Sequence, residues 1–322
     1  MKILGFLPFI LFPIMHGVAQ ENSILNPKFY GTGSWDEDSL GNHRVVMRVD
    51  KKADVVLAHI PWRRRDLNPE EKGIIIVNAT SGHIVKNVLP VNMNREFGDI
   101  LCQAEPGEYY VYYLKYIMGG RRNYPTVTYP VFKSEADQDW LSLATSRAKK
   151  LNKLPKAKLA QFQSIDQFNS FYPMEIIATE EETKHIIQEN KNTDYLLFPE
   201  KRENSIRMTT DLPLKWIQDG VTNTFSGQAM KGEYYTFQIG LFAANKNIDN
   251  VKVDFSGLQS HGKNGIYADA FTCFNTEGTD WEGHRMEKEC NVDQGKVQAL
   301  WIGVQVPENI ETGKFEGVVT VK

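Results

Sequence analysis

The last third of the chain, residues 232–322, carries the pattern that most constrains what this sequence can fold into. Its first strand candidate, 232–242, alternates apolar with other side chains, and its apolar positions are Tyr235, Phe237, Ile239 and Leu241. A period of two is that of a β-strand buried on one face. Two further strand candidates follow at 297–306 and 314–321, with turn residues at 311–313 between them. The sequence therefore predicts that this stretch ends on the last hairpin of an antiparallel β-sandwich.

A second set of strand candidates lies nearer the N-terminus. Each is short and is followed by turn-forming residues, and the candidates are 44–49, 54–60, 73–77 and 107–114. Short strands with turn signals between them are typical of a sandwich or a jelly roll. We therefore expect one β domain over residues 20–134 and a second one over residues 206–322.

The stretch between them, residues 135–205, has a different pattern. Three parts of it have the apolar spacing of short helices: 136–150, 164–168 and 179–187. Thr179 with Glu182 three positions later is the pattern of a capping box at a helix start. The predicted fold class is therefore mostly β: two antiparallel β-sandwich domains, jelly-roll or immunoglobulin-like, joined by a short helical connector. A length of 322 residues fits this division, because a single core rarely grows beyond about 300 residues.

The N-terminal residues 1–19 have the pattern of a secretory signal peptide. Lys2 supplies the positive start, a short apolar run follows, and 17–19 is a small-residue cleavage site that leaves Gln20 as the mature N-terminus. The apolar run is too short to remain as a membrane-spanning helix, and no cysteine follows the cleavage site to carry a lipid. We therefore expect a soluble protein exported to the periplasm or the extracellular space, with no stable membrane span.

Charge and motifs exclude several classes of function. The net charge is −3, and the longest basic run is 63–65, whereas nucleic-acid binders carry a basic stripe. The sequence has no phosphate-binding glycine loop, no Gly-x-Ser-x-Gly elbow and no His-Glu-x-x-His motif. We therefore predict no nucleic-acid partner, no cofactor and no metal site.

The three cysteines are Cys102, Cys273 and Cys290. In an oxidising compartment Cys273 and Cys290 are candidates for a disulfide, which would leave Cys102 unpaired. Three buried thiols are the alternative that we favour. No Cys-x-x-Cys spacing accompanies them, so metal binding is the weakest interpretation.

Two clusters are candidates for contact with a carbohydrate, and the first is Trp62, Arg63, Arg64 and Asp66. Planar guanidinium groups suit bidentate binding of carboxylates, and they also tie loops to acidic neighbours. Because the cluster follows a strand candidate, we favour a structural or interdomain ion-pair role over ligand binding.

The second cluster is Glu277, Asp280 and Trp281, in which two carboxylates flank an aromatic ring. Glycosidases hold an acid and its partner roughly 5–9.5 Å apart, which a glycine-flanked loop allows. A solvated loop with acidic turn residues is the interpretation that we favour. For Trp281, plugging the end of a sandwich is favoured over stacking on a sugar.

Several strings of residues resemble a known family. In the second β domain they are 225–233, 237–240, 273–278 and 298–304, which resemble the N-terminal domain of glycoside hydrolase family 123. In the first β domain, 60–66 and 106–113 look like the leading part of large exported glycoside hydrolase domain proteins of Bacteroides-type bacteria.

The resemblance implies a fold and an activity that reach beyond this chain. In that family a β-sandwich precedes a (β/α)8 barrel, and the barrel supplies an adjacent Asp-Glu pair. The acetamido group of the substrate is the nucleophile in the N-acetylgalactosaminidases of the family. The chain ends before such a barrel would begin, so no catalytic residue of the family can be assigned to any position here.

Three hypotheses follow. The leading one is that residues 20–322 are the non-catalytic N-terminal region of an exported glycoside hydrolase acting on N-acetylhexosamine-containing glycans, with a downstream barrel as partner. The alternative is a free-standing carbohydrate-binding or surface-adhesion protein. The third makes the chain itself catalytic through Glu277 and Asp280.

Overall fold

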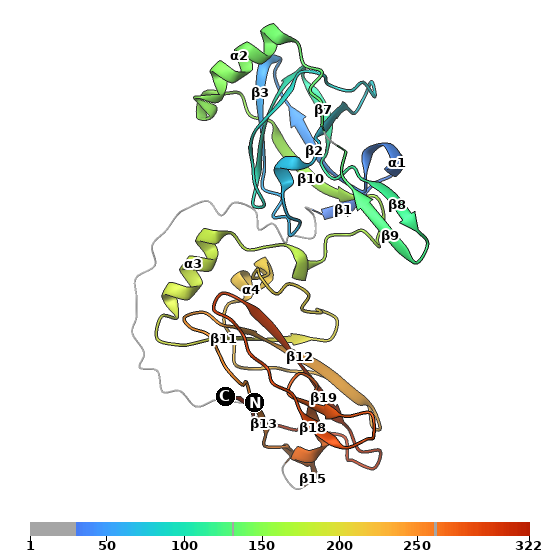
Figure 1. Ribbon diagram of the computed structural model, residues 1–322, viewed down its shortest axis with the longest axis vertical. Coiled ribbons are helices and arrows are strands. Elements are labelled where there is room, and N and C mark those ends of the chain that lie inside the picture. Colours follow the sequence, from blue (N-terminus) through green and yellow to red (C-terminus); the bar gives the residue numbers. More distant parts are fainter. Residues whose placement is uncertain (1–29, 131, 261–262) are drawn as a thin grey trace. The chain divides into compact units, whose positions relative to one another are not determined.

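The computed structural model describes residues 30–130, 132–260 and 263–322, so the predicted signal peptide at 1–19 lies outside the described residues. The chain divides into two compact units, with the boundary between Tyr172 and Pro173. Both units consist mainly of antiparallel β-sheets with few helices, which confirms the predicted fold class (Figure 1).

The first unit is a β-sandwich of two sheets. The larger sheet has the order β1-β10-β2-β7-β4, and its strands are Tyr30–Thr32, Lys158–Ser164, His43–Val49, Gly107–Tyr112 and Ile75–Asn78. The smaller sheet has the order β3-β6-β5, and its strands are Ala53–Ile60, Gly98–Ala104 and Val88–Met93. All neighbouring strands are antiparallel except the parallel pair of β1 and β10.

A hairpin and short helices complete this unit. The hairpin consists of β8 (Ile117–Arg121) and β9 (Tyr124–Thr128), and these two strands form a separate small sheet. The α-helices are α1 (Glu37–Leu40) and α2 (Gln138–Ala148), and the 3-10 turns are η1 (Pro69–Glu71) and η2 (Leu151–Lys153).

The alternation along β3 shows why the first unit has two apolar layers. Val56, Ala58 and Ile60 point into the core between the two sheets. The intervening Val55 and Leu57 point to the other face of the smaller sheet. There they meet the buried face of α2, which carries Trp140 and Ala144 (Figure 1). Both faces of the smaller sheet are thus covered, because successive residues of a strand point to opposite sides.

The second unit is organised around β12 (Tyr234–Phe242) and β19 (Val297–Gln305), which pair along their whole length. They form a sheet of order β11-β12-β19-β16, whose outer strands are Leu196–Lys201 and Phe271–Cys273. Three two-stranded sheets accompany it: β13 (Val253–Phe255) with β20 (Val319–Val321), β14 (Leu258–Ser260) with β15 (Lys263–Ile266), and β17 (Glu277–Thr279) with β18 (Arg285–Glu287). The helices are α3 (Glu180–Glu189) and α4 (Leu214–Asp219), with 3-10 turns η3 (Pro173–Glu175) and η4 (Ala268–Ala270).

One face of this sheet forms the core of the second unit, and the face carries the alternation seen in the sequence. The apolar positions of β12 that lie in this core are Tyr235, Phe237, Ile239 and Leu241. On the opposite face, the indole of Trp216 from α4 stacks on Phe198 of β11 with ring centroids 4.4 Å apart and planes 2° from parallel. Trp216 lies over Gly240 of β12, where a side chain would collide with the indole. A glycine on β12 therefore makes room for α4 on this sheet.

The structure corrects two local predictions. The last strand, β20, pairs with β13 and not with β19, so the predicted terminal hairpin is wrong. The alternation of β20 identifies a strand but leaves its partner open. Residues 164–168 are not a helix, because Ser164 ends β10 and a turn follows.

The predicted connector, residues 135–205, is divided between the two units. Its first helix is α2, and β10 after it belongs to the larger sheet of the first unit. Its last helix, α3, begins with the predicted capping box, in which the Thr179 hydroxyl accepts from the backbone N–H of Glu182 and the Glu182 carboxylate accepts from that of Thr179. Among the described residues, no helix combines the length and the apolar character that crossing a bilayer requires.

The contact between Trp216 and Gly240 gives a test of this packing. We expect Gly240→Ala to lower the free energy of unfolding by about 1–3 kcal/mol, because the added methyl forces the stacked indole to move. Urea unfolding followed by tryptophan fluorescence measures the change. Gly119→Ala on β8 is the control, because its methyl would meet only Thr126 Oγ1 at 3.4 Å. An unfolding free energy equal to that of the wild type in Gly240→Ala would contradict the role given to this contact.

Candidate functional site

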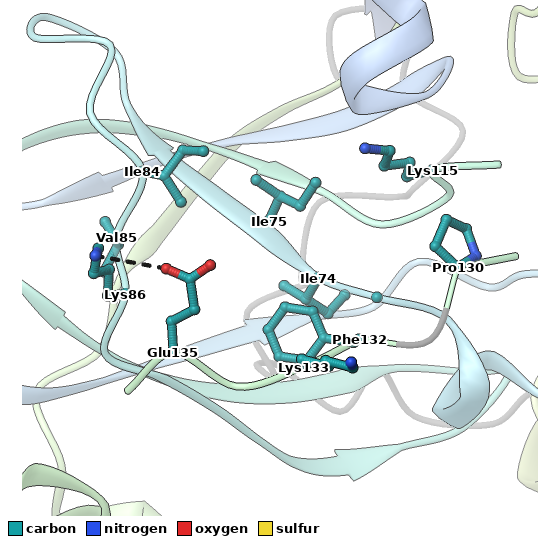
Figure 2. Close-up of a pocket in the computed structure, with 11 residues that line it drawn as sticks. Ile74, Ile75, Ile84, Val85, Lys86, Lys115, Pro130, Phe132, Lys133 and Glu135 are labelled. Carbon is teal, nitrogen blue, oxygen red and sulfur yellow. Dashed lines mark ion pairs between the residues drawn. The ribbon is translucent and has the colours of Figure 1, made fainter. Parts of the chain in front are cut away.

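A cleft of about 360 Å³ opens in the first unit beside β4, the strand at one edge of the larger sheet (Figure 2). Its residues come from three segments: 73–75, which leads into β4, 84–86, and the chain on both sides of the β8–β9 hairpin. The residues that line it are Gly73, Ile74, Ile75, Ile84, Val85, Lys86, Lys115, Pro130, Phe132, Lys133 and Glu135. The cleft therefore lies where the sheet ends and the hairpin begins.

Local hydrogen bonds fix the side of the cleft formed by residues 84–86. The backbone N–H of Val85 donates to the carbonyl of Ile76 at 2.8 Å, and that of Asn78 donates to the carbonyl of His83 at 3.0 Å. These bonds hold the segment along the outer edge of β4. On the other side, the ring of Phe132 packs over Gly73, whose missing side chain leaves room for it.

The interior of the cleft is apolar, and charged groups surround it. Figure 2 shows Ile74, Ile75 and Phe132 in the middle, with Lys86 and Glu135 at one end and Lys115 at the other. The Lys86 ammonium lies 3.6 Å from the Glu135 carboxylate. Within the described ranges, Lys115 and Lys133 have neither an ion pair nor a side-chain hydrogen bond. Among the described residues, these two cationic groups of the cleft therefore have no counter-charge.

The stretch that contributes these lysines is unusual in charge. From Tyr109 to Ser134 the sequence has no Asp or Glu, and its cations are Lys115, Arg121, Arg122 and Lys133. Both strands of the β8–β9 hairpin are exposed throughout, including the large side chains Ile117, Met118, Tyr124 and Val127. The hairpin is therefore a basic, apolar projection beside the cleft.

In the structure, the residues of the first candidate cluster, Trp62, Arg63, Arg64 and Asp66, contact other residues of the first unit. Trp62 is only 4% exposed, its ring packs against Tyr113 and over Gly98, and its indole N–H donates to the carbonyl of Asn94 at 2.8 Å. A ring in this position cannot stack on a sugar. Arg63 is half-buried, and its backbone N–H donates to the carbonyl of Glu96 at 3.0 Å.

A buried ion-pair cluster follows Trp62. Arg64 donates to both carboxylate oxygens of Asp66, at 2.8 and 2.7 Å, and Lys72 pairs with the same carboxylate. Burial would raise the pKa of Asp66, but the hydrogen bonds and charges of Arg64 and Lys72 outweigh it and lower that pKa. The cluster ties the loop after β3 to the residues around η1, which is the structural interpretation favoured from the sequence.

The second candidate cluster lies on the β17–β18 hairpin of the second unit. Glu277 accepts from the backbone N–H of Cys273 at 3.1 Å and pairs with Arg285 at 2.6 Å. Asp280 accepts from the backbone N–H groups of Glu282 and His284, at 2.9 and 2.8 Å. Both carboxylates are therefore engaged in holding their own hairpin.

Trp281 is 91% exposed, so it does not plug the end of the sandwich as the sequence favoured. Ligand atoms of the flanking Asp280, Glu282 and His284 lie within 4.8 Å of one another. His284 Nδ1 lies 3.3 Å from a carboxylate oxygen of Asp280 and 3.6 Å from one of Glu282, so these side chains contact one another on the surface of the hairpin. Trp281 thus remains the available aromatic surface of this cluster.

The cysteines are buried free thiols in the structure. Cys273 and Cys290 lie in the same core cluster of the second unit, and Cys102 lies in the core of the first. Burial raises the pKa of Cys290, and the neighbouring Cys273 adds to that rise. Burial alone raises the pKa of Cys102 to about 12. A disulfide between Cys273 and Cys290 stays a prediction.

The cleft was not predicted from the sequence, although one feature of the sequence indicates its charge. The acid-free stretch 109–134 is visible in the sequence, but the position of Lys115 and Lys133 beside Ile74 depends on contacts between distant segments. Spacing along the chain does not reveal such a site.

The ion-pair cluster predicts a pH-dependent stability. Because the pKa of Asp66 is lowered in the folded state, its stabilisation is present above the unfolded pKa near 4 and is lost as the pH falls through the folded value. We expect Asp66→Asn to lower the free energy of unfolding by roughly 3 kcal/mol at neutral pH, since it leaves two buried cations uncompensated. The difference from the wild type should shrink in acid.

Urea unfolding between pH 3 and pH 7, a range set by these pKa values, measures this difference. Glu70→Gln is the control, because it removes the same charge from an exposed position in η1. A difference that does not change with pH would contradict the assignment to the Asp66 carboxylate.

Comparisons with known proteins show a similarity that is confined to the first unit. Residues 33–165 match the family model described as glycoside hydrolase 123, N-terminal domain. We expected that domain at 206–322, which lies outside the matched range. Both units have the same strand alternation and turn residues. Short stretches of sequence therefore do not distinguish which of the two units resembles the family domain. No curated protein matches the chain.

Among the solved structures that match is a family 123 glycoside hydrolase from Clostridium perfringens that was analysed for its hydrolysis of glycolipid glycans. It has 16% sequence identity and a TM-score of 0.30, and the match covers 40% of this chain and 24% of that protein. The chain thus spans about a quarter of the length of that relative. The family model thus shows that residues 33–165 are similar to the N-terminal domain of glycoside hydrolase family 123.

Proposed function

We propose that this chain is the non-catalytic N-terminal region of an exported glycoside hydrolase that acts on N-acetylhexosamine-containing glycans. A (β/α)8 barrel downstream on the same polypeptide would carry the catalysis. The observation that carries the proposal is the match of residues 33–165 to the family's N-terminal domain.

The hydrogen bonds and the ion pair of two carboxylates support a non-catalytic role. The carboxylates that the sequence offered as an acid pair, Glu277 and Asp280, are engaged by Arg285 and by backbone N–H groups of their own hairpin. A glycosidase needs one carboxylic acid free to donate a proton to the leaving group. The two sandwich units therefore suit the support of a barrel, with residues 1–19 directing export to the periplasm or beyond.

The mass of the native mature protein tests this proposal. We expect a mass well above that of residues 20–322, and a reading frame that continues past Lys322 into alternating strands and helices. Mass spectrometry of the protein from its own cells, together with the genomic sequence, gives both results. A mass equal to that of residues 20–322 would overturn the proposal.

A second candidate function is a free-standing carbohydrate-binding or surface-adhesion protein. The observation that favours it is the exposure of Trp281, because an exposed indole provides a face on which a sugar ring can stack. Glycan binding without hydrolysis by the mature protein would support this function.

We expect Trp281→Ala to weaken binding to a glycan array by about twofold to thirteenfold if Trp281 is the stacking ring, from the typical 0.5–1.5 kcal/mol of aromatic contacts. Tyr267→Ala is the matched control, because Tyr267 is an aromatic residue of the same unit that is 81% exposed. Equal binding by the wild type and Trp281→Ala would remove this residue from the candidate surface.

A further inference from the structure

We infer that the cleft beside β4 binds an acidic saccharide, meaning a sugar unit that carries a carboxylate or a sulfate group. The anionic character of the ligand follows from the cleft itself. The choice of a sugar as its carrier rests on the proposed function.

The charges in the cleft give the first argument. Lys86 is neutralised by Glu135 at 3.6 Å, whereas Lys115 and Lys133 have no such partner within the described part of the chain. Lys115 is half-buried as a residue and lies at one end of the cleft, at the base of the β8–β9 hairpin. An anion placed between these lysines would supply the missing charge, and the apolar walls would strengthen the attraction.

The shape and the walls of the cleft give the second argument. Its volume of about 360 Å³ lies at the lower end of the range of small-ligand sites, which suits one or two sugar rings. Ile75 and Ile84 form an apolar wall, and the side chains of Ile84 and Phe132 are 63% and 39% exposed. The C–H face of a sugar packs against such a surface while its acidic group reaches the lysines.

The same structure disfavours a peptide strand in the cleft. A peptide that adds a strand to the sheet must form backbone hydrogen bonds along the outer edge of β4. Along Ile76–Asn78 that edge is occupied, because Val85 donates to Ile76 and Asn78 donates to His83. A ligand recognised through charge and ring packing, without a row of backbone hydrogen bonds, fits the space that remains.

The β8–β9 hairpin extends the basic surface from the cleft. Lys115 precedes β8 by two residues, and Pro130 follows β9 by two, so the base of the hairpin lies at the cleft. The hairpin adds Arg121 and Arg122 near its turn and the exposed ring of Tyr124. An acidic oligosaccharide longer than two units would therefore meet further cations and an aromatic ring along this projection.

The experiment measures binding of defined oligosaccharides to the mature protein by isothermal titration calorimetry. The probes are a chondroitin sulfate hexasaccharide, the unsulfated chondroitin hexasaccharide, which keeps only the carboxylates, and a neutral hexasaccharide of N-acetylglucosamine. We expect binding of at least one acidic probe, and binding that weakens as salt is added, because exposed charges are screened. We expect the neutral probe to bind more weakly than either acidic probe that binds.

Variants assign the binding to the cleft. We expect the double variant Lys115→Ala, Lys133→Ala to weaken acidic binding roughly tenfold, from about 0.2–1 kcal/mol for each exposed ion pair. The matched control is Lys191→Ala, Lys231→Ala, which removes two exposed lysines from the second unit. Phe132→Ala should weaken binding of the same probe, whereas Phe168→Ala, at a ring that is 95% exposed, should not. Thermal unfolding of each variant confirms that it is folded.

Three outcomes would overturn the inference. One is that neither acidic probe binds, and another is that the cleft variants bind as tightly as the control variants. The third is binding to phosphatidylserine vesicles but to none of the oligosaccharides, which would identify the basic hairpin as a membrane contact. None of these results bears on the native mass or on the downstream reading frame, so the proposed function would stand or fall separately.

Discussion

In both units, an indole packs over a glycine of a central strand, and the packing around each sheet depends on that contact. Trp62 lies over Gly98 of β6, and Trp216 lies over Gly240 of β12. A Cβ atom at either glycine would collide with the ring, so the close approach exists only because the side chain is missing. The indole N–H groups are also satisfied, by the carbonyl of Asn94 and by the carboxylate of Glu200. Each tryptophan thus buries a large apolar area without leaving a polar group unpaired.

The burial of these tryptophans also affects which charged residues are free to bind a ligand. Because Trp62 is buried, the charges beside it are buried as well, and Arg64, Asp66 and Lys72 neutralise one another. At β4, the edge strand of the larger sheet, the segment 83–85 occupies the outer side along Ile76–Asn78. Lys115 and Lys133 line the cleft beside this edge, and within the described residues neither has a counter-charge.

The sequence predicted much of the fold and little of the candidate site. Alternation identified β12 and β19, and the capping box placed the start of α3 within one residue. Alternation also identified β20 but not its partner β13, because period and turn residues describe a strand and not its neighbour. For the site, residue type suggested Trp62 as a sugar contact, yet its exposure depends on Gly98 and Tyr113, which are far from it in the chain.

The sequence by itself determined a mostly β chain of two sandwiches, the faces that each strand buries, and the acid-free stretch from Tyr109 to Ser134. These features follow from the order of residues along the chain, without contacts between distant segments. Only the tertiary structure decided which of the marked residues are accessible. It buried Trp62, exposed Trp281, and brought Lys115 and Lys133 to one apolar cleft. The reason is that burial and charge pairing depend on contacts between segments distant in the sequence, which periodicity and spacing do not encode.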